Sequence, residues 1–288
     1  MTDKPKSKFN KYIISLHPIF QENALILSQR TGLELKATFD PKENDLVIVF
    51  GGHDKANELL YLQNQKEFKF GYIIIATEQM NSAIYDNKNY ITLLKKNLVF
   101  PFSFEISKQL KLKYEIDSHS LYFFDFFNIE DTIDFNDRPI DFFFCGCKSD
   151  LRDKQIELLR KKMPDKNIEV DYDYSYTTPL ELMKKLTQVK YVLNIPFYEN
   201  SSLETHRIHR ALSASCKVLS LKPYLKYEEE GYDEFVIFVD SLDEFKDRRE
   251  GTEPLNERQS SQVPEWSVLM EKVGNKVLNH NLATIQNL

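Results

Sequence analysis

Short apolar runs that alternate with amphipathic segments dominate the first half of the chain. Unbroken apolar stretches occur at Tyr12 to Leu16, Leu46 to Phe50 and Gly71 to Ala76, and helical spacing separates them at Asn23 to Thr31 and Lys55 to Gln65. Apolar residues in an unbroken run are typical of strands that are buried on both faces of a parallel sheet. The alternation therefore predicts an α/β fold in which helices cover both faces of the sheet.

The second half of the chain repeats this alternation. Its strands are predicted to begin at Asp141, Ile168, Tyr191, Val218 and Phe235, after an aromatic and then polar stretch within 121–139. Single hydrophobic cores stop growing near about 250 to 300 residues, which is the length range of this 288-residue chain. We therefore expect two Rossmann-like domains, 1–138 and 139–262, and a final amphipathic helix within 263–288.

One segment, Val189 to Lys222, is predicted to form a strand, a polar loop, a helix and a second strand, which together make a parallel crossover unit. In open α/β sheets, ligands bind at the carboxyl ends of the strands. Four polar or aromatic residues follow the first strand closely enough to meet a ligand there, namely Asn194, Tyr198, Glu204 and Arg207.

Glu204 admits two interpretations from its sequence context. Its carboxylate only accepts hydrogen bonds, so at the mouth of a sheet it can bind both hydroxyls of a ribose. Ser201 and Glu204 also match the S-x-x-E capping box, in which the glutamate merely bonds back to an amide at the helix start. Arg207 follows one turn later, where it can pair with Glu204 or reach a phosphate.

An upstream strand and helix offer a phosphate-binding site. The apolar strand that begins at Asp141 leads into Gly146, which allows a tight turn. Ser149 or Asp150 can then cap a helix whose first turn contains Arg152. A helix N-terminus presents free amides to an anion, and a cation beside it suits a diphosphate. The alternative is an ordinary turn from strand to helix, because one glycine is much weaker than a glycine-rich fingerprint.

Both segments resemble the GT-B glycosyltransferases of the small bacterial and viral type. The segment YVLNIPFYENSSLETHRIHRALSASCKVLS is similar to the donor-binding segment of that family, in which the glutamate at the position of Glu204 binds the ribose of a nucleotide sugar. The segment DFFFCGCKSDLRDKQIELL resembles the family's strand, glycine turn and arginine-containing helix start, and GYIIIATEQM matches more weakly. Together these segments make up about half of the chain.

The resemblance implies a GT-B architecture, in which two Rossmann-like domains face each other across a cleft and a terminal helix crosses back to the first domain. It also implies transfer of a sugar, a hexose or a pentose, from a nucleotide-sugar donor to a hydroxyl of a glycan or lipid-linked glycan. The donor would bind to the second domain at Gly146, Ser149, Arg152, Asn194, Tyr198, Glu204 and Arg207. Neither a metal nor a cofactor is expected, because helix-end amides and cations can stabilise the leaving diphosphate.

Catalytic residues are expected in the loops that follow the strands of the first domain. His17, Asp54 and Glu78 are the candidates there, together with His53, which directly precedes Asp54 in FGGHD. An inverting transferase needs a base that takes the proton from the acceptor hydroxyl, and a histidine or a carboxylate can serve. The alternative is a structural histidine beside a glycine turn.

Position 196 bears on the stereochemistry of transfer. Many retaining GT-B enzymes carry a second glutamate upstream of the first, where this chain has Pro196. The sequence therefore favours inversion of the anomeric carbon, although some retaining families lack that glutamate as well.

Two other functions are compatible with the sequence. Asp171 and Asp173 form a D-x-D motif after a predicted strand, and such a motif holds a divalent metal and the donor diphosphate in GT-A glycosyltransferases. The position of the motif past the middle of the chain and the two-sheet pattern count against a GT-A fold. The chain can alternatively be a non-catalytic module that binds a nucleotide or a glycan, because fold resemblance does not establish turnover.

Charge, cysteine content and hydropathy limit the partners and the compartment. The formal net charge of -6 argues against nucleic acid, which needs a basic face. No apolar run approaches the ~20 residues of a membrane span, the first residues lack a signal-peptide core, and the three cysteines have no paired spacing. We therefore expect a cytoplasmic protein. The lysines between positions 95 and 113 form either a solvated helix face or a peripheral contact with anionic lipid at a membrane surface.

Overall fold

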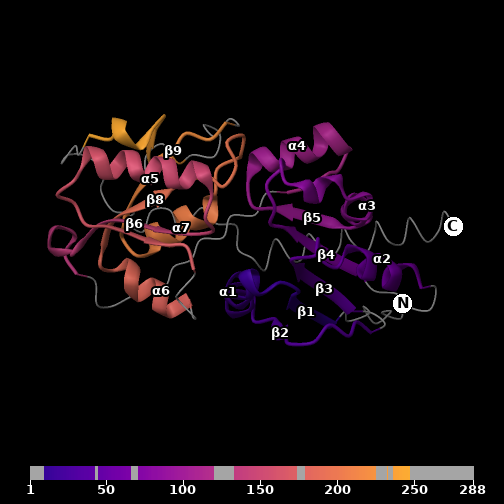
Figure 1. Ribbon diagram of the computed structural model, residues 1–288. Helices are drawn as coiled ribbons and strands as arrows, with labels where there is room; N and C mark the ends of the chain where they lie inside the picture. The colour runs from indigo at the N-terminus through magenta and orange to yellow at the C-terminus, as the bar shows by residue number, and fades with distance from the viewer. Residues whose placement is uncertain are drawn as a thin grey trace. The chain divides into compact units, whose positions relative to one another are not determined.

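The computed structural model describes residues 10–42, 45–65, 71–119, 133–173, 179–224, 232 and 236–246. These residues belong to two units, each built on one parallel five-stranded sheet (Figure 1). The α/β prediction is confirmed, and both sheets have the parallel arrangement of Rossmann-like domains. The helix expected within 263–288 lies outside the described residues, as does most of the stretch between the two sheets.

The sheet of the first unit has the strand order β2-β1-β3-β4-β5, and every neighbouring pair is parallel. Its strands are β1 (Asn10–Ser15), β2 (Glu34–Lys36), β3 (Asp45–Phe50), β4 (Gly71–Ala76) and β5 (Leu98–Pro101). Its helices are α1 (Gln21–Thr31), α2 (Ala56–Asn64), α3 (Lys88–Lys96) and α4 (Phe104–Tyr114), with short 3-10 turns at Pro18–Phe20 and Ala83–Asp86. The three predicted apolar runs form β1, β3 and β4, and the two predicted helices form α1 and α2.

The central strands of this sheet are buried because they are apolar on both faces. β3 and β4 are buried at every position. Val47 and Val49 pack in one cluster with residues of α2 and α3 such as Leu59 and Leu93. Ile48, which points to the opposite face, is only 1% exposed. With both faces covered, the strand ends are where polar loops can gather.

The sheet of the second unit has the strand order β10-β9-β8-β6-β7 and is also parallel throughout. Its strands are β6 (Ile140–Cys145), β7 (Ile168–Asp171), β8 (Val189–Asn194), β9 (Lys217–Leu221) and β10 (Val236–Val239). Its helices are α5 (Asp150–Lys162), α6 (Pro179–Leu186) and α7 (Thr205–Ser213), with short 3-10 turns at Phe135–Asp137 and Leu242–Glu244. Each strand begins within two residues of its predicted start.

Two apolar clusters cover the two faces of this sheet. Phe142 and Phe144 of β6 pack in the cluster that contains Ile156 and Leu159 of α5. Phe143, which points the other way, packs in the cluster that contains residues of α6 and α7. Figure 1 shows α5 and α6 on opposite sides of the sheet, in agreement with these clusters.

A buried arginine joins the start of the second unit to the end of α7. Arg138 is 3% exposed, and its guanidinium donates hydrogen bonds to the carbonyl oxygens of Ile133, Val189, Ala214 and Ser215. A cation at the end of a helix is favoured by the helix dipole. The residues directly before β6 are therefore part of the second unit.

The two sheets share one topology. In each, the second strand lies on one side of the first strand and the third strand lies on the other side, so the chain changes direction between β1 and β3 and again between β6 and β8. Ligands of open α/β sheets bind outside the carboxyl ends of the strands at such a switch point. The loops after β1 and β3, and those after β6 and β8, are therefore where functional residues are expected.

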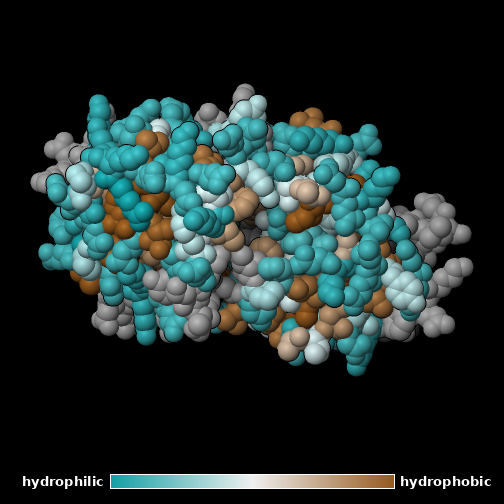
Figure 2. Space-filling model, viewed as in Figure 1, coloured by the Kyte–Doolittle hydropathy of each residue, from teal (hydrophilic) through white to brown (hydrophobic). Residues whose placement is uncertain are grey.

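Within the described residues, no helix has both the length and the apolar composition needed to cross a bilayer. The face in Figure 2 is mostly hydrophilic, with apolar residues in small groups. The predicted basic residues lie on α3 and α4, where Lys96 bonds to Asn64 and Lys111 pairs with Asp117, each at 2.8 Å. Contact of these lysines with lipid stays a prediction.

Candidate functional site

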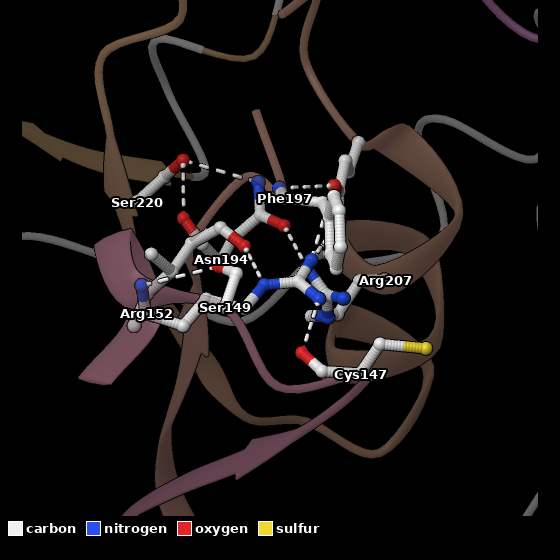
Figure 3. A network of polar contacts seen from close by, with 9 residues as sticks. Cys147, Ser149, Arg152, Asn194, Phe197, Arg207 and Ser220 are labelled. Atoms are coloured by element: carbon white, nitrogen blue, oxygen red, sulfur yellow. Dashed lines mark hydrogen bonds and ion pairs between the residues drawn. The ribbon is translucent and has the colours of Figure 1, made fainter. Parts of the chain in front are cut away.

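A network of charged side chains occupies the switch point of the second unit (Figure 3). At its centre, the side chain of Glu204 is 8% exposed and its carboxylate receives hydrogen bonds on both oxygens. Arg152 Nη2 lies 3.2 and 3.3 Å from the two oxygens, Arg207 Nη1 lies 2.5 Å from Oε2, and the Phe197 amide lies 3.1 Å from Oε1. Burial alone would raise the pKa of Glu204, but Arg207 and Arg152 hold this pKa below its usual value.

Arg152 is held entirely by protein groups. Its side chain comes from the first turn of α5, where Ser149 is the N-cap and accepts a hydrogen bond from the Arg152 amide, as predicted. The guanidinium donates to the Ile195 carbonyl from Nε, to the Cys147 carbonyl from Nη1 and to Glu204 from Nη2. Arg152 therefore joins the loop after β6 to the loop after β8 and to the start of α7.

Arg207 is the cation that retains free hydrogen-bond donors. Its Nη1 donates to Glu204 and, at 2.9 Å, to Asn194 Oδ1. Nε and Nη2 make no hydrogen bond within the described part of the chain, and the guanidinium stacks over Phe144 at 5.1 Å from the ring centre. The side chain is 13% exposed. Arg207 is thus oriented by its neighbours while one edge of its guanidinium stays open to a ligand.

Gly146 makes room for this guanidinium. A Cβ atom at position 146 would lie 3.1 Å from Arg207 Nη2 and 3.0 Å from the Phe144 ring, both closer than ordinary contact. Positive φ angles among the described glycines occur at Gly32 and Gly51, so Gly146 does not adopt the left-handed backbone. The glycine is therefore explained by the close approach of Arg207 to the loop after β6.

Asn194, the last residue of β8, serves as a buried support for Arg207. It is 2% exposed; its Oδ1 accepts from Arg207, and its Nδ2 donates to Ser220 Oγ at 3.1 Å. Ser220 lies on the adjacent strand β9 and is fully buried. The role of Ser220 was not predicted from the sequence, because a serine inside an apolar run carries no sign of its partner.

An exposed aromatic pair follows β8. Phe197 and Tyr198 are 37% and 39% exposed, and their rings meet edge to face at 4.9 Å. The Phe197 ring also lies 5.3 Å from the Arg152 guanidinium, and its amide bonds to Glu204. Because Phe197 is anchored on one side, the pair offers a fixed apolar surface next to the charged network.

The capping-box interpretation of Glu204 is wrong. α7 begins at Thr205 with Glu204 itself at the N-cap position, and the Glu204 side chain makes no capping bond. The Ser201 hydroxyl is buried and has no hydrogen-bond partner among the described residues. The two arginines compete for the carboxylate more strongly than a neutral amide does, since charge-assisted hydrogen bonds are the stronger ones. The predicted binding of ribose by Glu204 stays a prediction.

The D-x-D motif lies at the end of β7. Asp171 Oδ1 accepts a hydrogen bond from the Asp173 amide at 3.0 Å, and Tyr172 donates to Asp153 at 2.6 Å. Across the described ranges, no group of three or more histidine, cysteine or acidic side chains is arranged to hold a metal ion.

The three candidate catalytic residues of the first unit converge on its switch point. His17 follows β1, Asp54 follows β3, and Glu78 follows the adjacent strand β4. His17 Nε2 lies 3.8 Å from Asp54 Oδ2, and His53 Nε2 lies 3.4 Å from Asp54 Oδ1 and 3.6 Å from Glu78 Oε1. His53, which the sequence also offered as a candidate, therefore lies next to all three.

Burial divides this cluster into an outer and an inner pair. The side chains of His17 and Asp54 are 40% and 43% exposed, those of Glu78 and His53 only 23% and 7%. Burial lowers the pKa of His53 and nearby His17 lowers it further, while Asp54 opposes the shift. Burial, followed by the charge of Asp54, raises the pKa of Glu78. Groups whose environments displace their pKa values are typical of acid–base sites.

Gly51 fixes the position of His17. Its φ of 69° is in the left-handed region, and a Cβ there would lie 2.8 Å from the Cβ of His17. Thr77, next to Glu78, has a buried hydroxyl without a hydrogen-bond partner in the described residues. The turn at Gly51, after β3, is therefore needed for the close approach of His17, which follows β1.

Comparison with known proteins adds little to this geometry. No family model matches the chain, and no curated protein matches its sequence. Among solved structures, it is similar to a chain of the Glycosylation Associate Protein (Gap123) complex from Streptococcus agalactiae, with a TM-score of 0.42 and 11% sequence identity. The match covers 86% of this chain and 54% of the other, so this chain spans about half of that protein. A likeness at this level does not assign a function, which must be argued from the residues themselves.

Proposed function

We propose that the protein is a GT-B glycosyltransferase that moves a sugar from a nucleotide-sugar donor to a hydroxyl of a glycan or lipid-linked glycan. In this proposal the second unit binds the donor and the first unit binds the acceptor. The observation that carries the proposal is Arg207, whose free Nε and Nη2 lie at a switch point beside Gly146. It stands in the segment that resembles the donor-binding segment of the family.

The donor diphosphate is the ligand that best fits Arg207. A planar guanidinium with two free donors on one edge can bind a phosphate through paired hydrogen bonds. Glu204 and Asn194 hold its other edge, so little side-chain entropy is lost when the anion binds. In this role Arg152 acts through Glu204, because its own donors are engaged by protein acceptors.

The remaining donor contacts follow from the same loop. The exposed rings of Phe197 and Tyr198 suit the flat face of a nucleobase. Ribose binding at Glu204 requires its hydroxyls to displace one of the present hydrogen bonds, since both carboxylate oxygens already accept. No metal or other cofactor takes part, because Arg207 and the amides at the start of α5 supply the positive charge.

His17 is the proposed catalytic base, with Asp54 and Glu78 beside it. Its imidazole takes the proton from the acceptor hydroxyl, whose oxygen then bonds to the anomeric carbon of the sugar. The bond from that carbon to the diphosphate breaks, and its electron pair leaves with the diphosphate. Asp54 stabilises the imidazolium that forms, as the carboxylate does in other acid–base pairs. Attack from the face opposite the leaving group inverts the anomeric carbon.

Nucleotide binding is the first test. Uridine, guanosine, cytidine and thymidine diphosphates are each added to the full chain, and the shift in melting temperature is measured. A ligand at 100 times its dissociation constant adds about 2.7 kcal/mol of stability. At least one nucleotide should raise the melting temperature, and Arg207→Gln should weaken its binding about tenfold or more.

Arg160→Gln is the matched control, because Arg160 is an exposed arginine on α5, away from the network. It should bind the nucleotide as the parent does. A chain that binds none of the four nucleotides, or an Arg207 variant with the affinity of the parent, would remove the basis of the proposal.

A non-catalytic module that binds a nucleotide or glycan is the second candidate. Turnover of the nucleotide sugar separates it from a glycosyltransferase. Such a module binds the nucleotide sugar at Arg207 but forms neither a transfer product nor free sugar from it. To distinguish the module from a transferase, the parent and a variant lacking His17 are each incubated with the donor and an acceptor mixture, and the product is measured. Loss of product in His17→Gln with unchanged donor affinity supports transfer.

A further inference from the structure

The cluster of His17, His53, Asp54 and Glu78 in the first unit contains an imidazole that a ligand does not reach. The His53 side chain is 7% exposed, whereas His17 and Asp54 are more than a third exposed. Its ring lies against Phe20, His17 and Tyr90, with ring centres 6.1 to 6.4 Å apart. His53 therefore cannot act on substrate directly, and its place behind the exposed pair needs another explanation.

The titratable groups around His53 come from three loops and one helix. Its Nε2 faces Asp54 on its own loop, at 3.4 Å, and Glu78 from the loop after β4, at 3.6 Å. His17 approaches from the loop after β1, and Tyr90 of α3 lies edge-on to the ring. Tyr85 holds the Glu78 segment through a hydrogen bond from its hydroxyl to the Glu78 carbonyl. One nitrogen edge of His53 thus serves two carboxylates.

Only one tautomer of an uncharged imidazole suits this position. Two carboxylates face Nε2, so Nε2 must carry the hydrogen and donate it. The distances of 3.4 and 3.6 Å are longer than hydrogen bonds, as is common at acid–base sites before a ligand binds. Such a donor would hold Asp54, which is exposed and would otherwise move, against His17.

We propose that His53 is a positioning residue: it remains uncharged, donates its Nε2–H to Asp54 and Glu78, and thereby keeps Asp54 oriented toward His17. His17 is then the only imidazole of the cluster that exchanges a proton with a bound hydroxyl. This role rests on the proposed function for its catalytic consequence, but the tautomer and its effect on His17 are properties of the protein without ligand.

Nuclear magnetic resonance of the full chain with labelled histidine tests the first part. The chain has six histidines, and single His→Gln variants assign the resonances. Between pH 5.5 and 8, the His53 signals should be those of the uncharged Nε2–H form. Observation of an Nδ1–H tautomer at His53, or of a charged His53 over this range, would overturn the proposal even if glycosyl transfer is later demonstrated.

Substitutions test the second part. His53→Leu removes the donor, so Asp54 should lose its orientation toward His17 and the His17 resonances should shift, as they should in Asp54→Asn. His53→Gln keeps an N–H donor and should retain most of the parent behaviour. His119→Gln is the matched control, because His119 lies in the same unit but outside the cluster. Unchanged His17 resonances in folded His53→Leu, or an equal change in His53→Gln, contradict a positioning role.

The same variants separate positioning from binding once a donor is known. The expected effect of His53→Leu is a fall in kcat of about tenfold or more, with KM for the nucleotide sugar unchanged. His53→Gln should recover most of kcat. If no nucleotide sugar is turned over, the proposed function fails while the resonance measurements still decide the role of His53.

Discussion

Arg152 and Glu204 stand 52 positions apart in the sequence and meet in an ion pair that solvent barely reaches, with side chains 4% and 8% exposed. Arg152 also holds the carbonyls of Cys147 and Ile195, so this pair joins the loops after β6 and β8. The donor site proposed for Arg207 is therefore built on a buried charge network rather than on exposed side chains.

Removal of Arg152 should destabilise the protein strongly. Arg152→Ala leaves the Glu204 charge buried with Arg207 as its remaining cation and leaves two carbonyls without their donor. Loss of one partner of a buried ion pair costs about 3–5 kcal/mol. Urea unfolding of the full chain measures this loss. Arg160→Ala, an exposed change on α5, should remain within about 0.5 kcal/mol of the parent, and similar stabilities for the two variants would contradict the network.

The acid stability of the protein should depend on Glu204. Its pKa is lower in the folded chain than in the unfolded chain, so its charged form contributes stability that is complete above the unfolded value and is lost as the pH falls through the folded value. Below about pH 4.5 the free energy of unfolding should fall more steeply in the parent than in Glu204→Gln.

Glu157→Gln provides the control for this pH dependence, since Glu157 is an exposed residue of α5 that pairs with Lys161. Its unfolding free energy should follow the parent at every pH. Parallel curves for the parent and Glu204→Gln would mean that the carboxylate is not stabilised by the arginines.

The two adjacent glycines after β3 should respond very differently to alanine. Gly51 has φ of 69° and no room beside His17, whereas a Cβ at Gly52 would make ordinary contacts of 3.5 to 3.7 Å. We expect Gly51→Ala to lose about 2 kcal/mol or more and to displace His17. Gly52→Ala should stay within about 0.5 kcal/mol. Thermal unfolding and the His17 resonances measure both effects, and equal losses would contradict the close approach of the loops.

Much of the fold follows from the sequence because buried parallel strands are continuous apolar runs. β3 and β4 are buried at every position, so their runs needed no context to be recognised. A solvated helix face was one interpretation of the lysines of α3 and α4, but the bounds of these helices were not predicted, because each has only a narrow buried face formed by residues such as Leu93 and Ile106. The strand order that creates the two switch points is a property of long-range pairing and is absent from local patterns.

The candidate sites were predictable in position but not in detail. Residues after strand ends meet wherever parallel strands are neighbours, which explains why His17, Asp54 and Glu78 converge. The pairing of Glu204 with Arg207 was one of the expected alternatives, since residues three apart share a helix face. Its burial and the second arginine were not expected, because no local rule connects residues on different crossover units.

The proposed sugar transfer should not need a divalent metal. Activity with the nucleotide sugar should persist in a chelator, and it should survive the double change Asp171→Ala and Asp173→Ala, because the proposed positive charge comes from Arg207. Product formation is compared in the parent and the double variant. Complete loss of activity in the chelator that manganese restores, together with an inactive double variant, would favour the metal-dependent alternative.

Gly146→Ala should damage the proposed donor site more than the fold. The added methyl group would lie 3.1 Å from Arg207 Nη2, and because Phe144 is fully buried behind it, the mobile guanidinium is the group that must move. Nucleotide affinity should therefore fall about tenfold, equivalent to about 1.4 kcal/mol, with a stability loss of about 1 kcal/mol. Gly32→Ala is the control: its φ of 68° makes alanine strained, but the space around it is open, so stability should fall while nucleotide affinity is unchanged. Isothermal titration with the nucleotide found in the thermal screen measures both variants, and a Gly146→Ala protein that binds as tightly as the parent would show that the free edge of Arg207 is not where the anion lies.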